Sequence, residues 1–217
     1  LLTVQLWELE QARQPTTEHT FAELETALTD LAFAITDNHA PTYVSVEYAL
    51  QHMGSKSLLE TASNANFVEI EGDNVRFFYQ LMQEYFAARG LAHRVLLPRL
   101  SKPQFSINGL RVSQKWDSTI AMLAGISDDA DILLDELNDV DPYLALKCII
   151  AGTHVSTQVY EDTVRRIIQG DRRGRVEAAN LLTQIKHPLA LTAVLDAMRE
   201  GTWEARKQAN AILQSMT

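Results

Sequence analysis

The most chemically suggestive group in the sequence is a cluster of arginines around one expected turn between two helices. A guanidinium group stays charged and can form two parallel hydrogen bonds to a carboxylate or a phosphate. The cluster could therefore form a binding edge for an anionic ligand or a partner protein. The alternative is a solvated rim of a helical repeat. Its members are Arg165, Arg166, Arg172, Arg173 and Arg175.

A stretch of the opposite charge lies between residues 128 and 141. Several of its carboxylates fall near expected helix starts, where they complement the helix dipole. The stretch lacks the central glycine of an EF-hand loop, so we do not expect a calcium site. If neighbouring helices bring this acidic edge close to the arginines, the two edges would favour self-association or a bend in the helical arm. The acidic residues are Asp128, Asp129, Asp131, Asp135, Glu136, Asp139 and Asp141.

The composition restricts the classes of function. The 217 residues include 19 Lys and Arg against 28 Asp and Glu, and the formal net charge of −9 argues against binding nucleic acid through bulk charge. The one cysteine, Cys148, excludes an internal disulfide framework, and its apolar helical surroundings favour a buried, inert thiol. The six histidines are dispersed without the spacing of metal ligands, so we expect no metal site.

The common catalytic motifs are absent from the sequence. There is no phosphate loop, no glycine-rich dinucleotide motif, no HExxH and no GxSxG, so we expect no catalytic residue and no enzyme activity in this chain. No apolar run approaches the roughly 18 residues of a membrane helix, and no signal peptide is present. These features predict a helical module of the cytoplasm that does not bind membranes. The start at Leu1, without a methionine, suggests a piece of a longer protein.

Capping patterns predict three helices in the first part of the chain. Thr20 and Glu23 have the spacing of a capping box before an amphipathic helix that should end near Asn38. Ser45 can begin a short second helix, and Ser55 or Ser57 a third.

A hairpin should follow these helices. Residues 67–70 and 75–78 are rich in strand-forming side chains, and a tight turn around Gly72 separates them. A long helix is expected at about 79–96. Three helices followed by a two-stranded hairpin are typical of a winged helix, which we place at 18–97. Its expected recognition helix, Ser55–Asn64, has one Lys and no Arg, which disfavours DNA binding.

Prolines 98 and 103 mark a linker, after which the pattern is wholly helical. We expect seven helices joined by short turns, which is typical of antiparallel neighbours. The motif of Ala179, Asn180 and Gln184 recurs thirty residues later as Ala209, Asn210 and Gln214, which suggests a HEAT-like α-α superhelix over 98–217. The fold class is therefore mainly α with a small β wing. The expected helices are 112–124, 128–138, 142–151, 158–169, 173–186, 188–200 and 202–216.

Residues 75–88 (VRFFYQLMQEYFAA) resemble a motif near the end of the winged helix in NACHT-type STAND NTPases. These signalling ATPases include NOD-like receptors and bacterial defence proteins. The segment Gln83–Ala88 is the most specific part, and it stands after the strand pair, where the family has it. Lys115–Gly125 is similar to the first helix of the family's sensor arm. By the same resemblance, residues 1–17 would be the end of a preceding helical domain.

The resemblance implies roles for Tyr79, Gln83 and Glu84. The family commonly has a histidine where this chain has Tyr79, and that histidine reaches the β-phosphate of bound ADP. A tyrosine keeps a hydroxyl donor but carries no positive charge at neutral pH, so Tyr79 could contact nucleotide or could be an aromatic residue at the strand-to-helix junction. Gln83 and Glu84 could form a polar latch onto the adjoining domain. For Glu84, an intrahelical role near the helix start is the alternative.

The resemblance also implies a function without catalysis in this chain. The residues that bind ATP or ADP with Mg²⁺ would lie in an upstream NTPase domain. This chain would hold that domain closed at rest and then help it to open and oligomerise when the helical arm meets a protein trigger. A free-standing HEAT-repeat scaffold is the main alternative. A DNA-binding regulator and a HEAT-type lyase acting on tetrapyrroles fit the residues less well.

Overall fold

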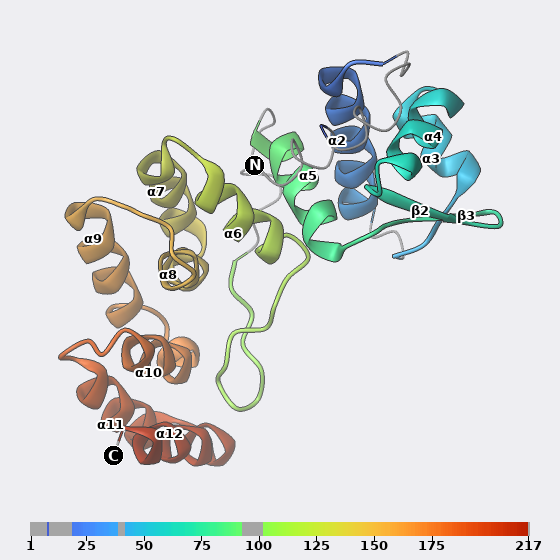
Figure 1. Ribbon diagram of the computed structural model, residues 1–217. Helices are drawn as coiled ribbons and strands as arrows, with labels where there is room; N and C mark the ends of the chain where they lie inside the picture. The colour runs from blue at the N-terminus through green and yellow to red at the C-terminus, as the bar shows by residue number, and fades with distance from the viewer. Residues whose placement is uncertain (1–7, 9–18, 39–41, 93–101, 217) are drawn as a thin grey trace. The chain divides into compact units, whose positions relative to one another are not determined.

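The computed structural model forms two compact units, residues 1–95 and 96–217, and each is considered separately below (Figure 1). The winged-helix prediction placed this boundary after residue 97, two residues later. The predicted preceding domain, 1–17, lies outside the described residues except for Glu8. The structure describes residues 8, 19–38, 42–92 and 102–216.

The first unit has a small antiparallel sheet flanked by helices. The strand order is β1-β3-β2, and Val75 of β3 pairs with Val44 on one side and Ile70 on the other. Helix α2 before β1, helices α3 and α4 between β1 and β2, and a hairpin with a two-residue loop make this the topology of a winged helix. The elements are α2 (Phe21–Asp37), β1 (Val44–Ser45), α3 (Val46–Met53), α4 (Lys56–Asn64), β2 (Val68–Glu71), β3 (Asn74–Phe77) and α5 (Gln80–Ala92).

The predicted caps in this unit are confirmed. The Thr20 hydroxyl accepts the backbone N–H of Glu23, and the Glu23 carboxylate accepts the N–H of Thr20, which completes the capping box. The hydroxyls of Ser45 and Ser55 cap α3 and α4 in the same way. The hairpin is also confirmed, and its first loop residue, Gly72, has φ +59°, which a glycine adopts without strain.

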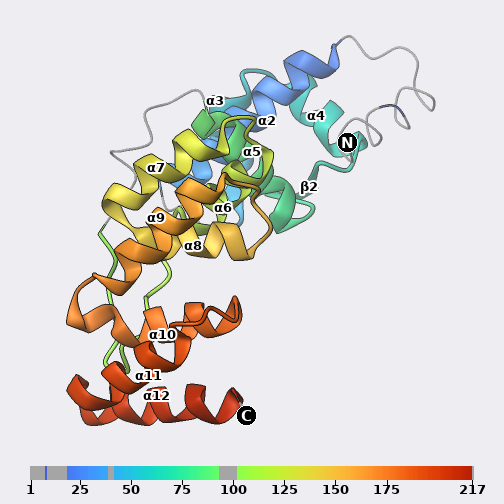
Figure 2. The same cartoon turned by 90° about the vertical axis from the view of Figure 1, so that its left-hand side faces the viewer.

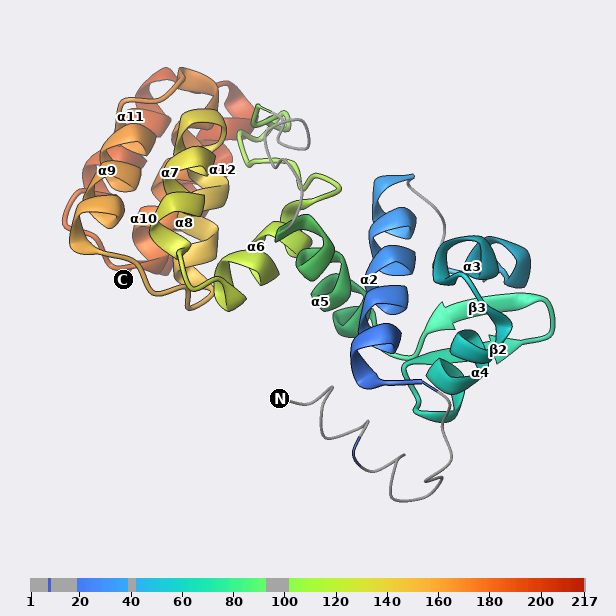
Figure 3. The same ribbon diagram turned by 90° about the horizontal axis from the view of Figure 1, so that it is seen from above.

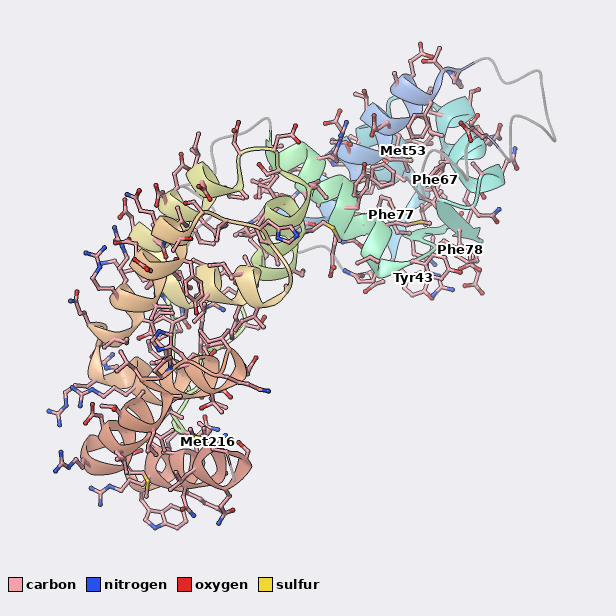
Figure 4. The ribbon with its side chains drawn as sticks, turned by 60° about the vertical axis from the view of Figure 1, so that its left-hand side comes forward. Tyr43, Met53, Phe67, Phe77, Phe78 and Met216 are labelled. Atoms are coloured by element: carbon pink, nitrogen blue, oxygen red, sulfur yellow. The ribbon has the colours of Figure 1, made fainter. Side chains whose placement is uncertain are left out.

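The core of the first unit lies between α2, α5 and the sheet. Leu24, Leu28 and Leu31 of α2 are fully buried, as is Phe86 of α5. Phe67 meets Phe86 edge-on with ring centroids 5.9 Å apart. Each such aromatic pair adds about 0.5–1.5 kcal/mol beyond the area that it buries. Figure 4 shows Phe67 and Phe77 reaching in from the sheet side toward α5. This apolar core fixes the position of the junction between β3 and α5.

In the second unit, the described residues 102–216 form helices and one ordered loop. Successive helices pack against each other, and helices two apart also touch, as in an α-α superhelix. Figure 2 shows α10, α11 and α12 stacked, and Figure 3 shows α7, α8 and α9 side by side. The helices are α6 (Asp117–Ile126), α7 (Ala130–Val140), α8 (Pro142–Ile150), α9 (Thr157–Ile168), η2 (Arg172–Gly174), α10 (Arg175–Gln184), α11 (Ala190–Glu200) and α12 (Trp203–Ser215).

Small residues let the last three helices approach closely. Ala179 of α10 and Ala209 of α12, equivalent in the expected thirty-residue repeat, are fully buried in one apolar cluster with Val194 and Ala197 of α11. A larger side chain at either alanine would separate the helices. The repeated alanines are therefore packing positions.

One expected helix begins later than the sequence suggested. The prediction began it at residue 112, whereas α6 begins at Asp117. Residues 102–116 instead form an ordered loop in which Phe105 and Arg111 make an isolated β-bridge. The helical periodicity of 112–116 was overridden by tertiary contacts of Arg111, described below.

No helix among the described residues is both long and apolar enough to cross a bilayer.

The turn before α10 depends on a glycine. A Cβ at Gly174 would overlap the Tyr143 side chain and lie 2.8 Å from the ring of Phe105. Tyr143 cannot move away easily, because it is buried between Phe105, Leu146 and Ile167.

We predict that Gly174→Ala destabilises the second unit by about 1–3 kcal/mol, because the extra methyl group overpacks this turn. Gly125→Ala is the matched control, since a Cβ there in α6 meets nothing within 4 Å; it should be neutral or stabilise by up to about 1 kcal/mol. Urea unfolding followed by circular dichroism measures both. Equal stability of the two variants would contradict this packing.

Candidate functional site

The second unit contains a buried ion cluster centred on Arg111. Its Nε and Nη2 lie 2.8 and 2.7 Å from Oδ2 of Asp141, and its Nη1 and Nη2 lie 2.5 and 2.8 Å from the two carboxylate oxygens of Asp117. The side chains of Arg111 and Asp141 are each only 1% exposed. One guanidinium thus bridges the first residue of α6 and the residue that precedes α8.

Close contacts hold this one guanidinium between two carboxylates, and burial raises the pKa of Asp141 above its usual value. Burial opposes the charged form of Arg111, but the hydrogen bonds that it donates to Asp117 and Asp141 outweigh that cost and raise the pKa of Arg111. Asp141 also accepts the backbone N–H of Leu144, so it caps α8 while it binds Arg111. Removal of either partner would leave the other charge uncompensated in a site away from water.

A second buried carboxylate extends the cluster to α10. Glu177 is 2% exposed, and its Oε2 accepts the backbone N–H of Arg111 at 3.2 Å. The other oxygen, Oε1, lies 2.7 Å from Nζ of Lys147 on α8. The side chain and the backbone of Arg111 are therefore held by three different helices.

This cluster holds the loop of residues 102–112 against the helices. Within the loop, the Ser106 N–H donates to the Leu110 carbonyl at 2.9 Å, and the Val112 N–H donates to the Gln104 carbonyl at 2.7 Å. Phe105 packs edge-on against Tyr143, with ring centroids 5.2 Å apart. The loop is thus a fixed part of the surface of the second unit.

Little in the residue pattern predicts this cluster. The pattern predicts Asp141 only as one of several carboxylates that complement helix dipoles, and it marks neither Arg111 nor Asp117. The only local signal was the Asp141–Pro142 pair, which is typical of a helix start. Asp141 and Glu177 lie 30 and 66 residues after Arg111 in the chain, so no local pattern connects them.

The structure divides the predicted arginine edge into two parts. Arg166 lies against acidic side chains, 2.9 Å from Asp139 and 2.5 Å from Asp162, and Arg165 pairs with Asp162 as well. Part of the acidic stretch, on α7, therefore lies beside Arg165 and Arg166, on α9, within the second unit.

The other three arginines line a groove. Arg172, Arg173 and Arg175 border a depression of about 290 Å³ whose opposite wall is the loop of residues 105–109. The start of α12 closes one end with Thr202, whose hydroxyl donates to the Ile107 carbonyl at 3.4 Å. The groove is therefore bordered by the loop, by the arginines of the η2 turn and the start of α10, and by the start of α12.

Part of the acidic stretch borders a separate depression. Asp131 and Asp135 line it together with Asp162 and Arg165. Hydrogen bonds from Ser156 lower the pKa of Asp131, so this carboxylate stays ionised at neutral pH. No cluster of possible metal ligands occurs within the described ranges.

The residues implied by the family motif lie at the junction of β3 and α5. Tyr79 is 58% exposed, and its carbonyl accepts the N–H groups of Met82 and Gln83 in the first turn of α5. Gln83 is buried. Glu84 is partly buried and accepts a 3.5 Å hydrogen bond from the Gln80 amide in the same helix, as its intrahelical interpretation expects.

The same junction carries an exposed apolar surface. Phe78 and Leu81 are 43% and 61% exposed on either side of Tyr79, and the Phe78 and Tyr79 rings lie 4.9 Å apart, edge to face. Tyr43 is also exposed, and the Arg76 guanidinium lies 5.1 Å from its ring centroid. We call Phe78, Tyr79 and Leu81 the junction surface.

Cys148 is fully buried in α8, and burial raises the pKa of its thiol to about 12. The thiolate is therefore absent at neutral pH, and the predicted inert thiol is consistent with this environment.

No protein-family model matches this sequence, and searches of curated proteins and of solved structures found no significant match.

We predict that Arg111→Met destabilises the second unit by about 3–5 kcal/mol, because it leaves Asp141 charged and unpaired in the interior. The double variant Arg111→Met with Asp141→Asn should recover at least about 1 kcal/mol, since an asparagine still caps α8 without a charge. Urea unfolding followed by fluorescence of the buried Trp116, in a chain with Trp7→Phe and Trp203→Phe, measures both.

The matched control for this prediction is Arg165→Met, since the Arg165 side chain is 62% exposed. It should change stability by less than about 1 kcal/mol. If Arg111→Met lowers the free energy of unfolding no more than Arg165→Met does, the charge of the cluster is unimportant for stability. The same conclusion follows if the double variant recovers none of the lost stability.

Proposed function

We propose that this chain is the regulatory and sensor portion of a STAND signalling ATPase similar to the NACHT type. In this proposal the winged-helix unit contacts the ATPase domain and responds to its nucleotide state. The helical unit binds a trigger or a partner protein. ATP or ADP with Mg²⁺ binds upstream of this chain, and the chain itself performs no catalysis.

The junction surface is the observation that carries this proposal. It exposes three large apolar side chains, Phe78, Tyr79 and Leu81, at the position where the family motif stands. Apolar side chains gathered in this way are typical of a protein contact. Gln83, beside them, is buried within the unit, so its support for the contact would come from holding the start of α5 in place.

The composition of α4 supports a protein contact over a DNA contact. Its one cation, Lys56, forms a 3.1 Å ion pair with Glu60 of the same helix. A recognition helix in the major groove needs cations for phosphates and commonly arginine for guanine edges. This winged helix is therefore better suited to packing against another domain.

Tyr79 would act without a charge in this mechanism. Its exposed hydroxyl can donate one hydrogen bond to a phosphate oxygen or to a group on the ATPase domain. The switch would then depend on docking and release of the whole unit, a rigid-body motion biased by the nucleotide. The alternative, a free-standing helical scaffold, is favoured by the groove in the second unit but leaves the junction surface without a role.

Three measurements test this proposal. The coding sequence upstream of Leu1 should encode a phosphate loop, and calorimetry of the present chain with MgADP or MgATP should detect no binding tighter than about 1 mM. In the intact ATPase, Leu81→Ser should raise basal nucleotide exchange about fivefold or more, because it weakens the contact that holds the closed state.

Leu191→Ser is the matched control, since Leu191 is exposed on α11 of the second unit and should leave nucleotide exchange unchanged. Micromolar nucleotide affinity of this chain, or an initiator codon directly before Leu1, would overturn the proposal. Equal effects of the two serine variants would overturn the role of the junction surface.

A further inference from the structure

The groove beside the η2 turn combines an apolar floor with a cationic border. Val176, Ala197 and Ala205 form its floor and are almost fully buried. Phe105 and Ile107 of the loop line the facing wall, and Ile107 is 75% exposed. The volume of about 290 Å³ is at the lower end of the range for ligand pockets, so it accommodates one or two side chains.

The charged side chains among the described lining residues of this groove are all arginines. Arg172, Arg173 and Arg175 line it, and none of its described lining residues is Asp or Glu. The nearby carboxylate of Glu177 is directed to Lys147 and to the Arg111 backbone. In a chain of net charge −9, these three arginines are a local concentration of positive charge.

The walls of the groove are held in place before any ligand binds. The loop wall is fixed by the buried Arg111 cluster and by the Thr202 hydroxyl on the Ile107 carbonyl. Close approach of this wall requires Gly109, where a Cβ would lie 2.8 Å from Cγ2 of Val176. A site that is already ordered loses little conformational entropy when it binds a ligand.

We propose that this groove binds a short acidic segment of a partner protein. One aliphatic or aromatic side chain of the segment enters the apolar floor, and carboxylates on either side of it pair with Arg172, Arg173 and Arg175. The bidentate geometry of guanidinium and carboxylate suits this pairing.

A peptide fits the groove better than a nucleic acid does. The floor is made of aliphatic side chains, whereas single-stranded nucleic acids stack their bases on aromatic platforms. The overall charge of −9 also repels a long polyanion more than a short acidic segment. This inference deepens the partner-binding part of the proposed function, and it does not depend on the ATPase assignment.

The test is fluorescence anisotropy of the whole chain with a labelled peptide, Glu-Glu-Leu-Glu-Glu. Affinity should be about 10–100 µM at low salt and should weaken as salt is added. The peptides Gln-Gln-Leu-Gln-Gln and Glu-Glu-Ser-Glu-Glu should each bind at least tenfold more weakly, because they lack the charges or the apolar anchor. A labelled oligothymidylate should bind more weakly than the first peptide.

Variants locate the binding site. Arg173→Glu and Ala205→Asp should each weaken binding at least tenfold, whereas Arg165→Glu, on the other part of the arginine edge, should change it less than twofold. Circular dichroism and thermal unfolding confirm that each variant is folded, and peptide-induced NMR shifts at residues 105–109 and 172–176 provide a readout that needs no substitution.

Three results would overturn the inference: no binding of the first peptide, equal binding of its glutamine version, or unchanged affinity in Arg173→Glu with no NMR shifts at the groove. If oligothymidylate binds more tightly than the first peptide, the partner of this groove is a nucleic acid and the inference is wrong. Each of these results leaves the nucleotide and junction experiments unaffected, so failure here is distinguishable from failure of the ATPase proposal.

Discussion

The second unit depends on one buried guanidinium. Arg111 bridges Asp117 at the start of α6 and Asp141 at the start of α8, while its backbone N–H reaches Glu177 in α10. Helix packing alone would join these three helices through apolar contacts that tolerate small shifts. A bidentate ion pair between buried groups has a much narrower geometry. This cluster therefore fixes where the loop of residues 102–112 lies on the helical array.

The position of that loop connects the fold to its proposed role. With the loop in place, Phe105 and Ile107 face Arg172, Arg173 and Arg175, and a helical surface becomes a groove with two walls. The first unit has a different organisation, since the apolar core between α2, α5 and the sheet holds the junction surface where β3 leads into α5. The two surfaces suit two kinds of contact: one apolar contact for a domain, and one charged contact for a short acidic segment.

The features that the sequence predicted are those set by neighbouring residues. Thr20 with Glu23, Ser45 and Ser55 act within three residues, and their caps appear as expected. The helical array followed from periodicity, and the repeated alanines marked true packing positions. The features that were missed depend on distant partners. The strand β1 exists only because Val44 pairs with Val75, and residues 112–116 are not helical because Arg111 is held by residues far along the chain.

The most direct test of this account is hydrogen exchange of the loop in Arg111→Lys, compared with the unchanged chain. A lysine keeps the positive charge but lacks the planar fork with which Arg111 makes two-point contacts to both Asp117 and Asp141. We predict that amides in residues 104–112, including Ser106 and Val112, exchange at least about tenfold faster in the variant, while those of α11 and α12 exchange at the same rate. Unchanged protection of residues 104–112 would contradict the claim that the buried guanidinium holds this wall of the groove.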